Sequence, residues 1–360
     1  MKAAIRRGNA LVVDAIDDPV PEAGEVLVKT LACGICGSDL HMLHHCEQFL
    51  PAMKKAGLSL FDFDPARDVV FGHEFCAEIV DYGPGTERKL KPGRRVCSMP
   101  LFVTPTGIEG VGYSNRYPGG FGEYMVLQEA NLLPVEGDLP SDLAALTEPL
   151  SVAVHAVSKA RLQGDEVPIV VGCGPIGLAT IIALKARGIG PVVASDFSAG
   201  RRALAEAVGA DVVVDPAVDS PFRHWLDFAA PPGCDPGNPL TALGVGPQPR
   251  PCVIFECVGV PGVIERLMTD APPRSRIVVV GVCMARDNFE PLVGICKELD
   301  LSFSFGYSGD EFARTLRQLA DGTLEAGRLI TGKVGVDGAA QAFEDLGRAE
   351  EHAKILIAFD

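Results

Sequence analysis

The chain has 360 residues, of which 47% are hydrophobic and 22% charged, and its formal net charge is −15. This length is more than one ordinary hydrophobic core needs and predicts two domains. The acidic balance disfavours nucleic acid and anionic membranes as partners. No run approaches the roughly 20 apolar residues of a membrane helix, and the first residues lack the apolar core of a signal peptide. We therefore expect a cytoplasmic protein.

The eleven cysteines are scattered, without the paired spacing of a small disulfide scaffold. Such scatter indicates reduced thiols or metal ligands in a reducing compartment. We expect most of them to be core residues. Four of these lie in or beside apolar runs: Cys76, Cys252, Cys257 and Cys283.

Residues 1 to about 150 have the short apolar or alternating runs, separated by glycine and proline turns, that are typical of strands. The clearest runs are residues 25–29, 76–80 and 124–127. No helical period is sustained before residue 146, where an apolar helical segment begins. The pattern predicts a β-rich first domain.

Strands and helices alternate from residue 167 onwards, which predicts a parallel sheet with helices on both faces. The stretch between residues 214 and 253 is rich in proline, and we expect most of it to lie on the surface. A helix near 310–320 and a strand at 355–359 are expected to return to the first domain. The other predicted strands are 169–171, 192–194, 212–214, 253–255 and 277–280, and the other helices begin after 177, at 198 and at 221.

Three glycines follow the strand at 169–171 with GxGxxG spacing. In such a turn the first glycine allows the tight bend, the second lets backbone N–H groups approach a pyrophosphate, and the third lets the helix pack closely on the strand. The glycines could be purely structural, but strand, helix and a following acidic residue are all in place. The predicted cofactor-binding residues are Gly172, Gly174, Pro175, Ile176, Gly177, Asp196 and Arg201.

Asp196 follows the last of these glycines by 19 residues, at the end of the next strand. Its carboxylate would accept hydrogen bonds from an adenosine ribose, which favours NAD over NADP. Arg201 and Arg202 lie about one and a half helical turns further on and could accept a 2′-phosphate, although the carboxylate would repel it. The alternative is a solvent-exposed helix face, which we favour for Arg202.

A second constellation lies in the first 150 residues: a thiolate, an imidazole and two carboxylates on separate segments. Cys36 lies in CGICGSDLH at 33–41, His73 and Glu74 in a GHE segment, and Glu148 before a proline. This mixed sulfur, nitrogen and oxygen set suits Zn²⁺, and catalytic zinc needs three protein ligands and an open position. Taken singly, each residue would be an ordinary core or turn residue.

With these motifs, the chain resembles the zinc-dependent members of the medium-chain dehydrogenase/reductase superfamily, the alcohol and polyol dehydrogenases. The resemblance implies an α/β protein with a GroES-like β-rich catalytic domain, residues 1–150 completed by 306–360. It also implies a doubly wound Rossmann NAD-binding domain, residues 151–305, with the active site in the cleft. The motifs that carry it are GICGSDLH, GHE, GGFGEYM, TEPLSVAVHA, GCGPIG, ECVG and KELDLSFSFGYS.

By position, the resemblance makes Cys36, His73 and Glu148 the zinc ligands, with Glu74 a neighbour that binds the metal in some states. A glutamate as the third ligand resembles the sorbitol and butanediol branch. The resemblance assigns no role to Cys33, so we do not expect a redox pair with Cys36.

Many relatives hold a structural zinc with four closely spaced cysteines, but residues 77–147 contain only Cys97. We therefore expect one catalytic zinc per chain and no structural zinc. The segment 42–71 is rich in Leu, Met and Phe. It would either wall a pocket for a bulky or apolar alcohol, or provide core packing or a subunit contact, and composition leaves both open.

The resemblance also implies a proton relay. Zinc lowers the pKa of the alcohol, hydride leaves to the nicotinamide, and Ser38 passes the proton through the cofactor ribose to His41. The ordinary pKa of a histidine, about 6.5, suits exchange with water. His44 and His45 are interpreted as surface residues outside the site.

We therefore expect a zinc-dependent enzyme that interconverts a secondary alcohol, diol or polyol with its ketone, using NAD. The alternatives are a zinc-free quinone or enone reductase of the same superfamily, and a non-catalytic NAD-binding protein. The only partners expected are a small-molecule substrate and further copies of the chain. Relatives pair through the edge of the Rossmann sheet, and the apolar run 299–305 suits a homodimer or homotetramer. The sequence does not predict which alcohol is the substrate.

Overall fold

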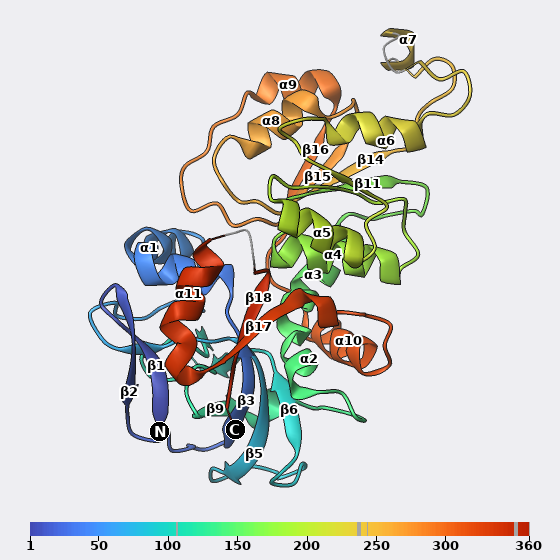
Figure 1. Cartoon of the computed structure of the whole chain (residues 1–360). Helices are drawn as coiled ribbons and strands as arrows, with labels where there is room; N and C mark the ends of the chain where they lie inside the picture. Colours follow the sequence, from blue (N-terminus) through green and yellow to red (C-terminus); the bar gives the residue numbers. More distant parts are fainter. Residues whose placement is uncertain (106, 236–238, 243, 349–351, 360) are drawn as a thin grey trace. The chain divides into compact units, whose positions relative to one another are not determined.

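The computed structural model describes all residues except 106, 236–238, 243, 349–351 and 360, and the chain divides into two compact units (Figure 1). The first unit contains residues 1–148, 312–323 and 330–360. The second contains residues 149–311 and 324–329. The predicted domain boundaries stay a prediction.

The first unit is built around β3 (Glu25–Gly34), a long strand in the seven-stranded sheet. It pairs antiparallel with β5 (Glu74–Tyr82), β9 (Tyr124–Gln128) and β18 (Lys354–Ala358). Gly34 lies opposite Glu74 in the register of β3 and β5. The sheet thus brings segments that are far apart in the sequence to the end of β3.

The remaining strands of the first unit complete this sheet and form two smaller ones. The seven-stranded sheet also contains β6 (Arg95–Ser98), β10 (Leu132–Pro134) and β17 (Ile330–Gly335). A three-stranded sheet contains β1 (Lys2–Arg7), β2 (Ala10–Ala15) and β4 (Val69–Val70). A two-stranded sheet contains β7 (Leu101–Thr104) and β8 (Gly107–Gly110). The helices of the first unit include α2 (Ser141–Ala145) and α11 (Ala339–Gly347), while α10 (Gly309–Ala320) and α3 (Thr147–Lys159) run across the unit boundaries.

The first unit also contains a helix that the sequence analysis missed. α1 (Gly37–Lys55) has 19 residues, so the expectation that no helical period precedes residue 146 is wrong. Its buried apolar residues, Met42, Leu43, Cys46 and Phe49, do lie on one helical face. A kink at His45 and a proline inside the helix break the pattern, and proline is a strong helix breaker in any sequence-based prediction.

The second unit contains a six-stranded sheet in which all strand pairs are parallel, as predicted. Both of its faces are covered. On one face, Ile169 of β11 packs in a core cluster with Trp225 and Leu267. Val170, the next residue of the strand, points to the other face. There it lies against Gly177, where an added Cβ would be 3.4 Å from its side chain. The strands in sheet order are β13 (Val212–Val214), β12 (Val193–Ser195), β11 (Val167–Val171), β14 (Cys252–Glu256), β15 (Arg276–Val279) and β16 (Asp300–Phe303).

Two helices of the second unit begin directly after a serine that caps them. Ser198 precedes α5 and its hydroxyl accepts the Arg201 N–H, while Ser220 caps α6. Part of the proline-rich stretch 215–251 lies outside the described residues. The helices are α4 (Pro175–Ala186), α5 (Ala199–Ala207), α6 (Pro221–Ala229), α7 (Pro239–Ala242), α8 (Val263–Asp270) and α9 (Pro291–Lys297).

All eleven cysteines are free thiols. Cys76 and Cys252 are buried, as predicted, but Cys257 and Cys283 are only half-buried, because both follow the ends of strands rather than lying within them. No helix in the described part of the chain combines the length and the apolar character that crossing a bilayer requires.

Candidate active site

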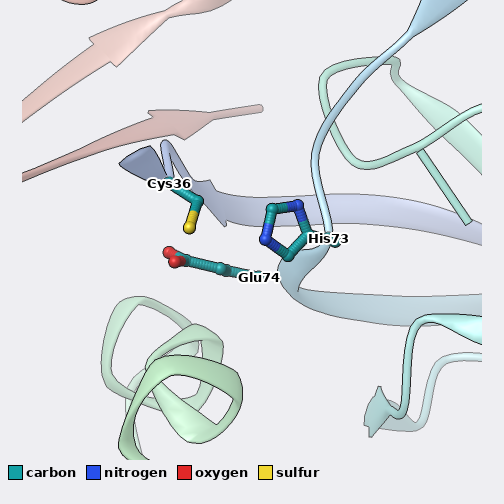
Figure 2. Close-up of side chains that lie close together, drawn as sticks. All are labelled: Cys36, His73 and Glu74. Atoms are coloured by element: carbon teal, nitrogen blue, oxygen red, sulfur yellow. The ribbon is translucent and has the colours of Figure 1, made fainter. Parts of the chain in front are cut away.

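Three of the four predicted metal residues come together at the end of β3. The ligand atoms of Cys36, His73 and Glu74 all lie within 4.8 Å of one another, and their side chains point toward a common centre (Figure 2). Cys36 is the residue before α1, and Glu74 is the first residue of β5. One thiol, one imidazole and one carboxylate at this spacing fit a zinc ion.

Asp39 orients two of these groups from the first turn of α1. One of its oxygens, Oδ2, accepts the backbone N–H of Cys36 at 2.9 Å, and the other lies 3.4 Å from Nδ1 of His73. Burial lowers the pKa of His73, but the negative charge of Asp39, together with Cys36, outweighs it and holds the pKa well above its usual value. A carboxylate behind a metal-binding histidine fixes the orientation of the ring.

Lys354 forms a buried ion pair with Glu74. Its Nζ donates to both carboxylate oxygens, at 2.7 and 2.6 Å, and to the carbonyl of Ile35 at 2.9 Å. The side chains of Lys354 and Glu74 are 2% and 0% exposed. Burial lowers the pKa of Lys354, but Glu74, Cys36 and Glu148 outweigh it and raise the pKa. The sequence analysis missed this residue, although a lone lysine beside the apolar run 355–359 was a usable signal.

Glu148 does not belong to the cluster of three. It lies half-buried in the first turn of α3, within the first unit. Its charge raises the pKa of Lys354, the ion-pair partner of Glu74, so Glu148 lies near this ion pair. Its role as a zinc ligand stays a prediction.

The two predicted relay residues lie on α1. The Ser38 Oγ is 2.8 Å from the hydroxyl of Tyr113. His41 is half-buried, and burial together with the charge of His45 lowers its pKa. His44 and His45 are exposed, in agreement with their interpretation as surface residues.

Tyr113 is a second residue that the sequence analysis missed. Its hydroxyl donates to Asp39 Oδ1 at 2.9 Å, and its ring centroid lies 5.1 Å from that of His73. It lies in a loop, between β8 and β9, that matches no motif. Only its position in space links it to the site.

The segment 42–71 packs aromatic side chains behind Tyr113. The ring of Phe61 lies 5.1 Å from Phe49 and 5.0 Å from Tyr113, and Phe71 lies 5.7 Å from Tyr113. Phe49 and Phe71 are buried. For these side chains, core packing is therefore the better of the two interpretations.

The phosphate loop in the second unit shows why each glycine is needed. Gly172 has φ +90°, and a Cβ there would lie 2.7 Å from the Val258 side chain. A Cβ at Gly177 would lie 1.8 Å from the carbonyl oxygen of Gly172. At Gly174, the residue before α4, a Cβ would meet nothing within 4 Å. The face of the loop at the helix N-terminus is therefore open to an anion.

Asp196 follows β12 directly and closes onto this loop. Its carboxylate accepts the backbone N–H of Cys173 at 2.7 Å and that of Ser198 at 2.8 Å. Burial and Asp196 raise the pKa of the Cys173 thiol, and the charge of the nearby, half-buried Arg201 acts in the opposite direction. The Arg201 Nε is buried and has no hydrogen-bond partner among the described residues. Pro175 and Ile176 form the first turn of α4.

The interpretation of Arg202 as a residue of a solvent-exposed helix face is wrong. Its side chain is 21% exposed and pairs with Asp215 at 3.1 Å. It also donates to the carbonyls of Asp196 and Phe197. Arg202 therefore holds the turn between β12 and α5.

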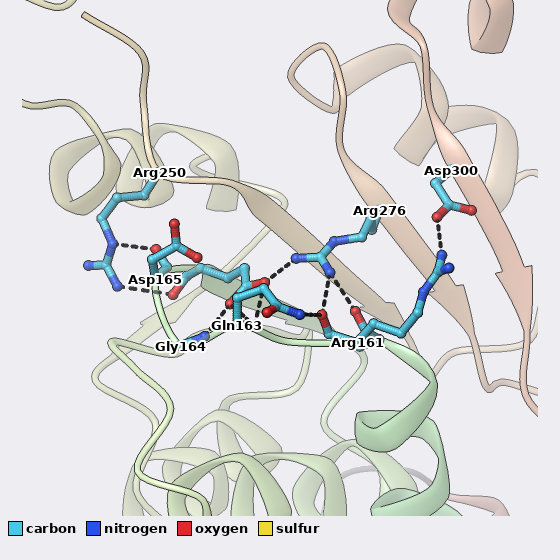
Figure 3. A network of polar contacts seen from close by, with 9 residues as sticks. Arg161, Gln163, Gly164, Asp165, Arg250, Arg276 and Asp300 are labelled. Atoms are coloured by element: carbon cyan, nitrogen blue, oxygen red, sulfur yellow. Dashed lines mark hydrogen bonds and ion pairs between the residues drawn. The ribbon is translucent and has the colours of Figure 1, made fainter.

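A closed polar network occupies the opposite end of the sheet (Figure 3). Glu166, 1% exposed, accepts two backbone N–H groups of the preceding turn and pairs with Arg276. Arg250 donates to three backbone carbonyls, and Arg161 pairs with Asp300 at 2.7 Å. These charges are paired within the unit, at the end of the sheet opposite the phosphate loop.

Two family models match the chain. That of the alcohol dehydrogenase GroES-like domain matches residues 22–137, and that of the zinc-binding dehydrogenases matches residues 175–321. The chain is 31% identical over 360 residues to (R,R)-butanediol dehydrogenase of Bacillus subtilis (strain 168), covering 96% of this chain and 95% of the relative. It is 29% identical over 342 residues to sorbitol dehydrogenase of Rattus norvegicus, covering 91% and 87%.

Solved structures agree over the full length. The 2R,3R-butanediol dehydrogenase from Bacillus subtilis superimposes with a TM-score of 0.79 at 29% identity, covering 100% of this chain and 99% of the other. A protein described as a zinc-binding dehydrogenase, from Sinorhizobium meliloti 1021 and bound to NADP, superimposes with a TM-score of 0.80 at 26% identity, covering 99% of each chain.

Proposed function

Because the chain belongs to the zinc-dependent medium-chain dehydrogenase/reductase superfamily, we propose that it oxidises a secondary alcohol, a diol or a polyol to the ketone with NAD. It is an oxidoreductase of CH–OH groups, and its family uses zinc and a nicotinamide cofactor. The gathering of Cys36, His73 and Glu74 carries the proposal.

In the proposed site, Cys36, His73 and Glu148 hold the zinc. When bound, zinc supplies a Lewis acid that lowers the pKa of the alcohol hydroxyl toward neutrality. Lys354 donates to both oxygens of Glu74, so a bond from Glu74 to the metal would compete with this ion pair. This ion pair supports a resting arrangement in which Glu74 stands beside the metal rather than on it.

The alcohol proton is handled by Ser38 and His41. The Ser38 hydroxyl would accept it and release its own proton toward the bound cofactor, from where it would reach His41, further along the same helix, for exchange with water. Burial and the charge of His45 lower the pKa of His41, which favours its neutral form and makes it a weaker base that releases a proton to water readily.

The cofactor is held by backbone N–H groups of the loop from Gly172 to Gly177, with Pro175 and Ile176 at the start of the helix. Asp196 receives the adenosine ribose and favours NAD. Arg201 would act against this preference, because its Nε, which has no partner among the described residues, could donate a hydrogen bond to the 2′-phosphate of NADP. The NADP-bound relative is a reason to measure both cofactors.

We propose one zinc per chain, because the only cysteine in residues 77–147 is the buried Cys97. We also propose a cytoplasmic homodimer or homotetramer. β16 is the edge strand of its sheet, and Phe303 and Phe305 are 60% and 54% exposed beside it. Such an edge can pair with a second copy.

The test is zinc content per chain together with reduction of NAD and of NADP across secondary alcohols, diols and aromatic alcohols, before and after chelation. We expect about one zinc, activity lost on chelation, and a higher kcat/KM with NAD. Protein that contains no zinc yet reduces quinones or enones would favour the zinc-free reductase. Cofactor binding without turnover of any alcohol would favour a non-catalytic protein.

A further inference from the structure

The hydroxyl of Tyr113 joins two parts of the site that have different tasks. It lies 2.8 Å from Oγ of the relay residue Ser38 and 2.9 Å from Oδ1 of Asp39. Tyr113 is 3% exposed, so no bulk water competes for these bonds. Asp39 in turn faces the predicted zinc ligands, through its contacts with His73 and with the backbone N–H of Cys36.

The direction of these hydrogen bonds follows from the chemistry of the groups. An ionised carboxylate only accepts, so the single hydroxyl proton of Tyr113 is donated to Asp39. The bond between Tyr113 and Ser38 must then run the other way, with Ser38 donating. Tyr113 therefore uses neither lone pair of the Ser38 oxygen, and these can accept from an alcohol. When Ser38 takes the alcohol proton it must release its own, so the bond to Tyr113 holds the Ser38 hydroxyl only in the resting site.

The ring of Tyr113 is held so that its hydroxyl cannot easily swing away. Phe61 and Phe71 lie 5.0 and 5.7 Å from it, and the imidazole of His73 lies 5.1 Å from it. Aromatic contacts at these distances stabilise one ring orientation. The segment 42–71 thus contributes to the site by fixing Tyr113.

We propose that Tyr113 is a positioning residue, which sets the donor direction of Ser38 and, through Asp39, the orientation of His73. This inference rests on the proposed function, since it concerns the proton acceptor and a zinc ligand of that site.

Tyr113→Phe is the test variant, and Tyr117→Phe is its matched control. Tyr117 lies in the same loop, is also 3% exposed, and its hydroxyl bonds a buried carboxylate, Glu25, at 3.2 Å. We expect Tyr113→Phe to lower kcat about 10-fold, at the lower end of the effect of groups behind metal ligands. Tyr117→Phe should stay within about 2-fold, since the loss of one buried hydroxyl bond alone lowers stability by only about 1 kcal/mol.

Two further readouts separate positioning from a general loss of structure. In a Ser38→Ala background and with saturating zinc, Tyr113→Phe should lower kcat less than about 2-fold, because the two residues act on one step and their effects are not additive. The apparent zinc affinity, measured by competition with a chromogenic chelator, should fall about 3- to 10-fold in Tyr113→Phe and stay unchanged in Tyr117→Phe.

Equal effects of the two Tyr→Phe changes, or an undiminished effect in the Ser38→Ala background, would overturn the inference while leaving the dehydrogenase intact. If the wild-type chain turned over no alcohol and bound no zinc, the proposed function itself would fail. The two failures are therefore distinguishable.

Discussion

The candidate metal centre and the phosphate loop are built in opposite ways. The metal centre takes side chains from the end of β3, the start of β5, a loop near residue 113 and the strand at 354. The phosphate loop is one continuous stretch, residues 172–177, whose close packing depends on glycines and whose one side-chain partner from elsewhere, among the contacts described above, is Asp196. The first should therefore be sensitive to the loss of functional groups, and the second to the addition of atoms.

The largest effect is expected at the metal centre. Cys36→Ala should lower kcat by on the order of 10³-fold or more, because the metal that activates the alcohol loses its thiolate ligand. Zinc content should fall with it, while NAD binding, measured by calorimetry, is retained. Cys33→Ala is the matched control, since it removes the other thiol of the CxxC pair. A Cys36→Ala protein as active as the wild type would refute the metal assignment.

Lys354→Met tests the buried ion pair. It leaves the carboxylate of Glu74 buried without its cation, which typically destabilises a protein by about 3 to 5 kcal/mol. The double change Lys354→Met with Glu74→Gln should recover part of this loss, because no unpaired charge remains. Urea denaturation of the three proteins measures both effects. A single variant as stable as the wild type would show that the pair contributes little.

Two glycine changes sharpen the contrast within the phosphate loop. Gly174→Ala adds a methyl group to open space, so it should leave Tm unchanged but weaken NAD binding about 10-fold, or ~1.4 kcal/mol. Gly177→Ala drives the same group into the Gly172 carbonyl, and the strain of such overpacking is about 1 to 3 kcal/mol. It should therefore lower both Tm and affinity. Equal behaviour of the two variants would contradict this division of roles.

The smallest effect is expected at the far end of the second unit. Burial raises the pKa of Glu166, but backbone N–H groups and Arg276 outweigh it, so the folded-state pKa lies below the ordinary value of 4.5. The stabilisation is then fully present above about pH 4.5 and is lost as the pH falls through the folded-state pKa. Glu166→Gln should flatten the acid limb of the stability profile between pH 6 and 3. An acid limb as steep as that of the wild type would assign acid sensitivity to other groups.

Elements with local signals could be predicted from the amino-acid sequence. The alternating pattern after residue 167, the helices predicted from 198 and 221, and the GxGxxG spacing all concern residues close together in the chain, and the parallel sheet follows from the alternation. Cys36, His73 and Glu74 were also within reach, because they lie in short motifs. The helix α1 escaped prediction because a kink at His45 and a proline interrupt its period.

The groups that surround those residues could be identified only from the folded chain. Tyr113 and Lys354 reach the site across 74 and 280 residues of sequence, through the packing of a loop and the pairing of β18 with β3. Arg202 likewise is not part of an exposed helix face, because it forms an ion pair with Asp215 on a neighbouring segment. Such partnerships depend on where strands and loops are placed in space, and a local pattern carries no record of that placement.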